Sequence, residues 1–287
     1  ATRFKTNTLT PASQEILKQL EGGLTLTTYS NLMNEDFSLT LPVNINTDKR
    51  RFRQYTRFKP EMEMNYVYYY DSCVVDPSES IFPGLSFDER VRRFAETMGV
   101  DLSRYLAPVE IRKMVDLRGE EGRFVRQFKR ENGESSFLRI YSDMLRHPQE
   151  SEISASLKRL VRKPPLVGCV RGHGERNVWG HGLRGYSMFT RQHDHRYSLI
   201  NQGFDVKELT LESPLIDSVD ILLVAEPREP FSEREMDALE KYVERGGDLI
   251  VLTNPGREHA VAPVLRLVGV RQLPGTLVRL SKELQPN

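Results

Sequence analysis

The chain has 287 residues, which is long enough for two ordinary domains that each bury their own core. Its 41 Lys and Arg residues are balanced by 40 Asp and Glu residues, and the resulting net charge of +1 excludes a global field that attracts nucleic acid or a membrane surface. No apolar run approaches the roughly 18–20 residues of a membrane span, and residues 1–10 do not have the apolar core of a signal peptide. These features fit either a cytoplasmic protein or a soluble piece of a longer one.

The first half of the chain predicts alternating strands and helices. Thr10 as an N-cap and Pro11 at the first helical position begin a helix, and Gly22-Gly23 is expected to end it. Strands are then expected at 24–30 and 64–71, and helices at 48–58, 88–100 and 150–162.

Residues 122–142 give the clearest hairpin signal of the sequence. Two alternating strands flank Asn132-Gly133, a dipeptide typical of a type I′ turn. The order strand, helix, strand, helix, hairpin, helix over 24–162 is that of a thioredoxin-like α/β layer. Because the chain has no Cys-x-x-Cys pair, thiol–disulfide exchange is not expected.

The second half predicts a different sheet. Apolar strands are expected at 165–172, 204–211, 218–227 and 248–256, with helices at 187–202 and 231–247. Ser232 and Glu235 form a capping box at the start of the last helix. Strand–helix alternation of this kind favours a doubly wound, mostly parallel sheet with right-handed crossovers.

The sequence therefore predicts an α/β protein of two domains, with a boundary near Pro164-Pro165, which cannot continue a helix. Residues 1–163 are expected to form a thioredoxin-like domain. Residues 164–287 are expected to form a Rossmann- or flavodoxin-like domain similar to the class I amidotransferases. Residues 277–287 read as a chain cut within that domain.

The chain contains two cysteines, Cys73 and Cys169. Both stand in apolar, strand-like contexts, which favour buried, unreactive thiols over a disulfide framework. We expect that neither is functional and that they do not pair.

Three loops are expected at the carboxyl edge of the second sheet, where ligands gather in parallel α/β folds. They are 171–177, 226–230 and 253–259, and they also bring in His259. The candidate ligand- or partner-binding residues are Gly172, His173, Gly174, Glu175, Arg176, Trp179, Glu226, Arg228, Asn254 and Arg257. The plain alternative is a strand-end turn in which the glycines serve positive φ and the charges are solvated.

Catalytic and cofactor motifs are absent from the sequence. It has no Gly-x-Ser-x-Gly elbow, no Gly-x-Gly-x-x-Gly fingerprint and no Walker A motif. Among metal candidates, His193 and His195 lie two apart, so that one ion does not easily take both on a helix. We therefore predict no catalytic residue, no cofactor and no metal. The alternatives are a glycan-acting hydrolase or transferase that uses His173 and Glu175 as acid and base, and a cytoplasmic redox or nucleotide-binding protein.

Three stretches together resemble one protein family. TRFKTNTLTPASQEILKQLEGGLTLTTY (2–29) is similar to the segment that follows the first membrane helix of GldG-type proteins. KRLVRKPPLVGCVRGHGE (158–175) and DILLVAEPREPFSEREMDALEKYVERGGDLIVLTNPG (220–256) are similar to the ABC-transporter auxiliary domain of the same proteins. Residues 40–145 match in element order more than in sequence.

The resemblance implies a non-enzymatic, extracytoplasmic domain of an ABC-2-type transporter subunit, linked in some relatives to gliding motility. It implies a periplasmic location, a membrane-anchored full-length protein, and permease and ATPase partners. The resemblance names no ligand; a carbohydrate and a peptide are the candidates, and nucleic acid is not expected. Trp179 is either a platform for such a ligand or a core residue.

Overall fold

The computed structural model describes residues 8–273, and the prediction made for 277–287 lies outside them. Contacts divide the chain into two compact units. The first unit contains the chain up to residue 164 together with 193–203, and the second contains 165–192 and the chain from 204 onward. The α/β class predicted from the sequence is confirmed, with a mixed sheet in one unit and a parallel sheet in the other. Each unit is described by itself.

The first unit is built on a four-stranded sheet of order β2-β1-β3-β4. Its strands are β1 (Leu24–Asn31), β2 (Met62–Tyr69), β3 (Val125–Arg130) and β4 (Ser135–Arg139). Strand β1 pairs in parallel with β2 and antiparallel with β3, and β3 pairs antiparallel with β4. Leu26 of β1 and Phe128 of β3 are buried with Leu157 in one apolar core.

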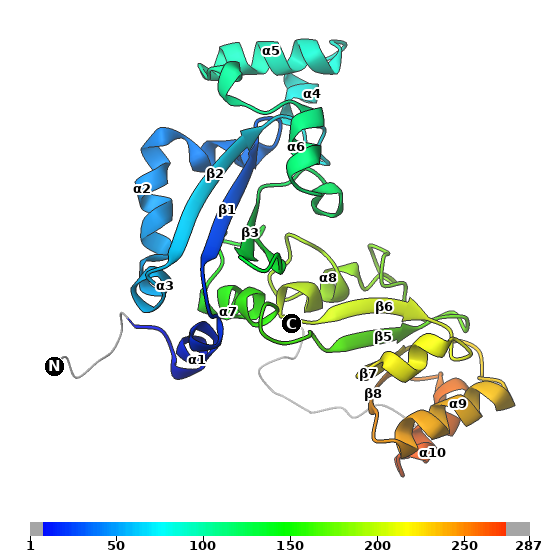
Figure 1. The fold of residues 1–287 in the computed structure, drawn as a ribbon. Helices are drawn as coiled ribbons and strands as arrows, with labels where there is room; N and C mark the ends of the chain where they lie inside the picture. Colours follow the sequence, from blue (N-terminus) through cyan, green and yellow to red (C-terminus); the bar gives the residue numbers. More distant parts are fainter. Residues whose placement is uncertain (1–7, 274–287) are drawn as a thin grey trace, which may run out of the picture. The chain divides into compact units, whose positions relative to one another are not determined.

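Seven α-helices are described in this unit. They are α1 (Pro11–Gln19), α2 (Pro42–Arg51), α3 (Arg53–Phe58), α4 (Pro77–Ile81), α5 (Phe87–Met98), α6 (Pro108–Met114) and α7 (Glu150–Lys158). Figure 1 shows α2 and α3 along the sheet and α4, α5 and α6 beyond the carboxyl ends of β1 and β2. The Thr10 cap of α1 is confirmed, since its side chain accepts a hydrogen bond from the Ser13 amide.

Several predicted details of the first unit are wrong. Helix α1 ends at Gln19, before the glycine pair, and α7 ends at Lys158. The hairpin is confirmed, but its turn is not type I′, because Gly133 has a positive φ (92°) while Asn132 does not. Cys73 lies in the loop after β2 and not in a strand.

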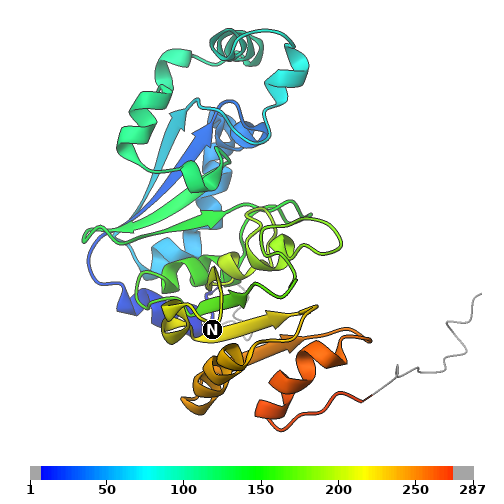
Figure 2. The ribbon, with the colours of Figure 1, turned by 90° about the vertical axis from the view of Figure 1, so that its right-hand side faces the viewer.

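The second unit is built on a four-stranded parallel sheet of order β6-β5-β7-β8. Its strands are β5 (Leu166–Val170), β6 (Asp205–Leu209), β7 (Ile221–Ala225) and β8 (Asp248–Leu252). Its helices are α8 (Ser187–Thr190), α9 (Glu233–Glu244) and α10 (Glu258–Leu267). Figures 1 and 2 show α9 and α10 side by side against the sheet, where Leu239 and Val264 are buried with Leu222 in one core.

Local signals explain the elements of the second unit that the sequence predicts well. The capping box of α9 is confirmed, because the Ser232 side chain accepts from the Glu235 amide and the Glu235 side chain accepts from the Ser232 amide. Strand β5 is buried along its whole length, as expected for a strand covered on both faces. The helix predicted at 187–202 is wrong, since only α8 and a short 3-10 turn at Leu199–Asn201 form there.

Candidate functional site

The loop that follows β5 holds His173 between two carboxylates. Its Nε2 atom lies 3.1 Å from Oε2 of Glu235, on α9, and its Nδ1 atom lies 3.4 Å from Oε1 of Glu175. The His173 amide also donates to Glu175 Oε2 at 2.7 Å, and the Phe231 ring lies 4.4 Å from the imidazole. Nε2 is therefore held by a hydrogen bond to Glu235, whereas Nδ1 and Glu175 Oε1 are buried without a hydrogen-bond partner among the described residues.

Glu235 has two roles at this point. Its Oε2 atom accepts from the Ser232 amide and hydroxyl, at 2.9 and 2.7 Å, and also faces His173. Burial raises the pKa of Glu235, but the hydrogen bonds from Ser232 and then the neighbouring His173 outweigh it and hold that pKa below its ordinary value. The sequence indicates the cap at Glu235 and gives no sign of its contact with His173.

Backbone hydrogen bonds tie the three carboxyl-edge loops to one another. The His173 carbonyl accepts from the amides of Arg228 and Glu229, at 2.7 and 3.2 Å. The Arg228 carbonyl lies 3.2 Å from His259 Nε2, which belongs to the loop after β8. The loops at 171–177, 226–230 and 253–259 therefore meet at one edge of the sheet.

Glu226 forms the centre of a group of charges at this edge. Its carboxylate lies 2.7 Å from Arg176 Nη2 and 3.7 Å from Arg184 Nη1. Glu226 is buried and has a left-handed φ of 52°, which is uncommon for a residue other than glycine and is often found at functional positions. Arg184 was not predicted, because it lies in an irregular loop that no periodic pattern places at the sheet edge.

The two predicted glycines have the positive φ angles expected of a sharp turn, 127° for Gly172 and 71° for Gly174. A Cβ atom at Gly174 would stand 3.1 Å from Cδ of Arg228, whereas a Cβ at Gly172 would meet nothing within 4 Å. The Gly174 carbonyl also accepts from Arg184 Nη2 at 2.7 Å. Gly174 therefore allows two arginine side chains to approach the turn.

Trp179 lies at a neighbouring hollow of about 440 Å³. This hollow is also lined by Gly172, Gly174 and Arg176. The indole Nε1 donates to Glu208 Oε2 at 2.7 Å, and the Arg191 guanidinium lies 3.3 Å from the centre of the ring. Since Trp179 is 54% exposed, the interpretation of it as a core residue is wrong.

Asn254 and Arg257 lie on the loop between β8 and α10. Asn254 is exposed, and its carbonyl accepts from the Arg257 amide at 3.2 Å. Arg257 stands at the N-cap of α10, and its charge acts on Arg184. The loop of Arg257 meets the loop of Arg228, because His259 Nε2 lies 3.2 Å from the Arg228 carbonyl, and Asn254 has a role in the loop backbone.

The first unit has a hollow of its own, of about 800 Å³, at the carboxyl end of β2. Asp71, which accepts from Arg112 Nε and Nη2 at 2.9 and 2.7 Å, stands at this hollow. Tyr69 also lines it, and its buried hydroxyl has no hydrogen-bond partner among the described residues. No sequence motif indicates this hollow.

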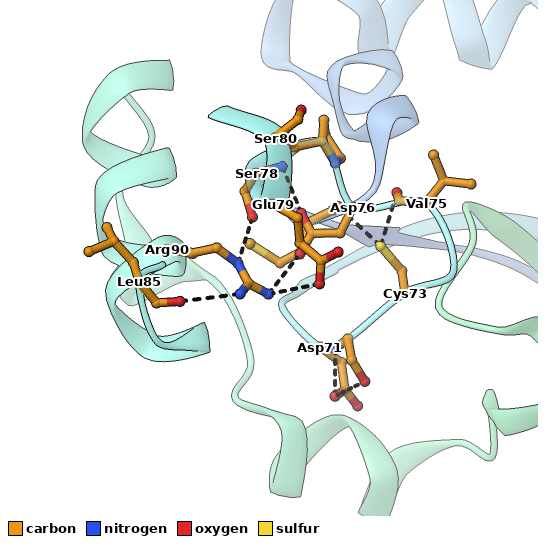
Figure 3. Close-up of polar contacts among 12 residues, drawn as sticks. Asp71, Cys73, Val75, Asp76, Ser78, Glu79, Ser80, Leu85 and Arg90 are labelled. Atoms are coloured by element: carbon orange, nitrogen blue, oxygen red, sulfur yellow. Dashed lines mark hydrogen bonds and ion pairs between the residues drawn. The ribbon is translucent and has the colours of Figure 1, made fainter. Parts of the chain in front are cut away.

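Figure 3 shows the loop between β2 and α5 next to this hollow. The Cys73 thiol donates to the carbonyls of Met33 and Val75, at 3.1 and 3.2 Å. Arg90 joins the loop to α5 through Asp76 and Ser78, at 3.3 and 3.2 Å. These contacts give the segment around Cys73 a fixed conformation.

Both cysteines are free thiols in different units. Burial is the main cause that raises the pKa of Cys73 to about 12 and the pKa of Cys169 to about 12. At neutral pH both are therefore protonated and weakly nucleophilic.

The described part of the chain contains no group of three or more His, Cys, Asp or Glu side chains placed to hold a metal ion. In residues 8–273 no helix combines the length and the apolar character that a membrane crossing requires.

Comparison with known proteins gives one match. Residues 164–274 match the model of a family described as an ABC-type uncharacterized transport system. No curated protein and no solved structure matches the chain. The matched segment contains β5, β7, β8 and the three loops at their carboxyl ends. The family match therefore supports an auxiliary protein of an ABC-type transport system.

Proposed function

We propose that the chain is a non-enzymatic, extracytoplasmic binding or assembly domain of an ABC-2-type transporter subunit of the GldG type. The family match over residues 164–274 is the observation that carries this proposal. The resemblance of residues 2–29 to the segment after a membrane helix supports the extracytoplasmic location and an anchored full-length protein. A link to gliding motility or to export follows from the same resemblance.

The topology supports the fold assignments that belong to this proposal. In the first unit, the order β2-β1-β3-β4 with β3 antiparallel to β1 is that expected of a thioredoxin-like layer. In the second unit, the order β6-β5-β7-β8 of parallel strands is that of the first strands of a flavodoxin-like sheet. We infer a domain boundary at 163/164 on the same grounds.

The geometry of His173 supports binding over catalysis. A general base needs a nitrogen that can reach a substrate proton, and here Nε2 is bonded to Glu235 and Nδ1 is buried, 3.4 Å from Glu175. Nothing in this arrangement favours the glycan-acting hydrolase. The hollow beside Trp179 is instead suited to a partner side chain or a sugar ring, since the indole is exposed beside backbone of two glycines.

The proposal is tested by purifying the tagged full-length protein from its own membranes in a mild detergent. We expect an ABC permease and an ABC ATPase to be recovered with it in fixed ratio. Replacing His173 and Glu175 by alanine should reduce that recovery, whereas the exposed helix variant Glu240→Ala should leave it unchanged. Recovery of neither subunit contradicts the assembly role.

The location is tested with an alkaline phosphatase fused after residue 273 in the full-length protein. This reporter folds to an active form in an oxidising compartment, so we expect activity. A fluorescent protein that folds only in the cytoplasm serves as the reciprocal fusion. Fluorescence without phosphatase activity contradicts the extracytoplasmic location.

A further inference from the structure

Four arginines gather at the carboxyl edge of the parallel sheet in the second unit. Arg176 follows β5, Arg184 lies in the loop before α8, Arg228 follows β7, and Arg257 precedes α10. Arg184 and Arg228 both approach Gly174, the first through a 2.7 Å hydrogen bond to its carbonyl and the second through its side-chain carbons.

Two of these four cations share one carboxylate. Glu226 pairs with Arg176 at 2.7 Å and is 3.7 Å from Arg184. Within residues 8–273, Arg228 and Arg257 form no ion pair. The cluster is therefore short of negative charge.

Three other carboxylates at this edge have their own partners, and Glu229, beside Arg228, is exposed to solvent. Glu175 and Glu235 face His173, and Glu235 also accepts from Ser232. Glu258, next to Arg257, accepts from the Gly256 amide at 3.1 Å. These acids are used to hold the loops and do not neutralise the guanidinium groups.

The excess positive charge affects the pKa of an arginine within the cluster. Burial, followed by the charges of Arg228 and Arg176, lowers the pKa of Arg184, and Glu226 only partly opposes them. Nε of Arg176 is buried without a hydrogen-bond partner. Guanidinium groups brought together in this way match the planar geometry of carboxylate and phosphoryl oxygens.

We propose that Arg184, Arg228 and Arg257 bind an oxyanion group that carries at least two negative charges, of the phosphoryl or polycarboxylate class. The anion enters beside Gly172, where a Cβ atom would meet nothing within 4 Å. This site gives a ligand class to the binding edge of the proposed function and rests on that binding role, but it does not depend on the transporter assignment.

The experiment is isothermal titration calorimetry of the chain at low ionic strength and pH 7.5, with pyrophosphate, citrate and sulfate as separate probes. We expect saturable binding of pyrophosphate or citrate and weaker binding of sulfate. Arg228→Gln and Arg257→Gln should each weaken that binding about tenfold or more, as expected for a charge-assisted hydrogen bond. Binding of pyrophosphate alone assigns a phosphoryl group, and binding of citrate alone assigns a polycarboxylate.

The matched control is Arg266→Gln, which removes the same charge at the exposed far end of α10. It should leave the affinity unchanged. A second readout is the thermal midpoint without anion, which Arg228→Gln should leave unchanged or raise, because it relieves repulsion among like charges. A loss of affinity in Arg266→Gln equal to that in Arg228→Gln overturns the site, as does the absence of binding by all three probes.

Failure of this inference is distinguishable from failure of the proposed function. If no anion binds while permease and ATPase are still recovered with the full-length protein, the oxyanion site alone is wrong. If the anion binds and neither subunit is recovered, the transporter role is wrong and the site stands.

Discussion

Arg126 lies inside the first unit with a side chain that is 1% exposed, and its Nη2 is 2.6 Å from Oδ1 of Asp48. Tyr66 donates its hydroxyl to the other oxygen of Asp48, at 3.0 Å. The guanidinium also lies 4.8 Å from the ring centre of Phe124. A charge held in this way is stable only while its partner is present, since the interior does not solvate it.

We therefore expect Asp48→Asn to lower the free energy of unfolding by about 3–5 kcal/mol, because it leaves the Arg126 charge buried without a counter-charge. Urea denaturation measures this change. The double variant Asp48→Asn with Arg126→Met removes both charges and should be more stable than Asp48→Asn alone. A single variant as stable as the parent protein contradicts this role of the pair.

His147 gives the first unit a defined dependence on pH. Burial is the main cause that lowers the pKa of His147 from 6.5 to about 4, and the charges of Arg126 and Arg51 act in the same direction. The unfolded chain binds the proton more tightly, so this stabilisation is complete above pH 6.5 and is lost as the pH falls towards about 4.

We expect the free energy of unfolding of the parent protein to fall as the pH is lowered from 6.5 to 4.5. Part of this slope comes from the one proton that His147 takes up on unfolding. His147→Gln should reduce that slope by the contribution of this one proton. Urea denaturation at several pH values gives the slope, with His181→Gln, at an exposed position, as the control. An unaltered slope in His147→Gln speaks against this assignment.

The elements of the fold were predictable where a local chemical signal defines them. The capping box of α9 and the buried strand β5 depend on residues a few positions apart, so that the sequence predicts them. The helix predicted at 187–202 fails for the opposite reason. Its residues bond to distant partners, such as Asp194 to Ser142 and Arg196 to Asp143, and these contacts override local helical preference.

Gly168, in the middle of β5, is closely packed by side chains of neighbouring elements. A Cβ atom here would stand 2.5 Å from Cδ2 of Leu209 and 2.8 Å from Cγ2 of Val219, which is closer than side-chain atoms pack. We expect Gly168→Ala to lower the free energy of unfolding by about 1–3 kcal/mol through overpacking.

Chemical denaturation of Gly168→Ala and of Gly119→Ala tests this expectation. A Cβ at Gly119 meets nothing within 4 Å, so this control should behave as the parent protein. Equal stability of the two variants rules out the close packing described for β5.

For the candidate site, the sequence predicted which loops meet, since parallel strands bring their carboxyl ends to one edge. It did not predict Arg184 or Glu235 as neighbours of Glu226 and His173. Arg184 reaches the edge from an irregular loop, and Glu235 reaches it from the first turn of a helix. Such contacts depend on three-dimensional placement and have no spacing rule in the chain.

On the scale of the whole molecule, the segment 193–203 belongs to the first unit although it lies within the sequence of the second. Arg196 fixes it there. This side chain is 4% exposed, donates to Asp143 Oδ2 at 2.6 Å and to the buried Glu152, and lies 4.4 Å from the Tyr141 ring centre. The hydrogen bond that Arg196 donates to Asp143 is the main cause that raises the pKa of Arg196.

We expect Arg196→Met to lower the free energy of unfolding by about 3–5 kcal/mol, because Glu152 is then left buried without its counter-charge. The exposed pair of Arg118 and Asp116 is the matched comparison, with Nη2 and Oδ2 2.6 Å apart. Arg118→Met should leave the free energy of unfolding close to that of the parent protein, because the pair is exposed to solvent. A small effect of Arg196→Met in thermal or urea unfolding argues against a structural role for the segment.

The interrupted path of the chain has a consequence for the order of events during synthesis. A ribosome makes residues 165–192 of the second unit before it makes the segment that completes the first. At about 5–20 residues per second, these 28 residues (192 − 165 + 1) take roughly 1–6 s. During that interval Glu152 has no Arg196 to meet, while β5 has been synthesised without β6 and β7, the strands that pair with it. The hydrophobic cores of both units are therefore incomplete in the nascent chain during this interval.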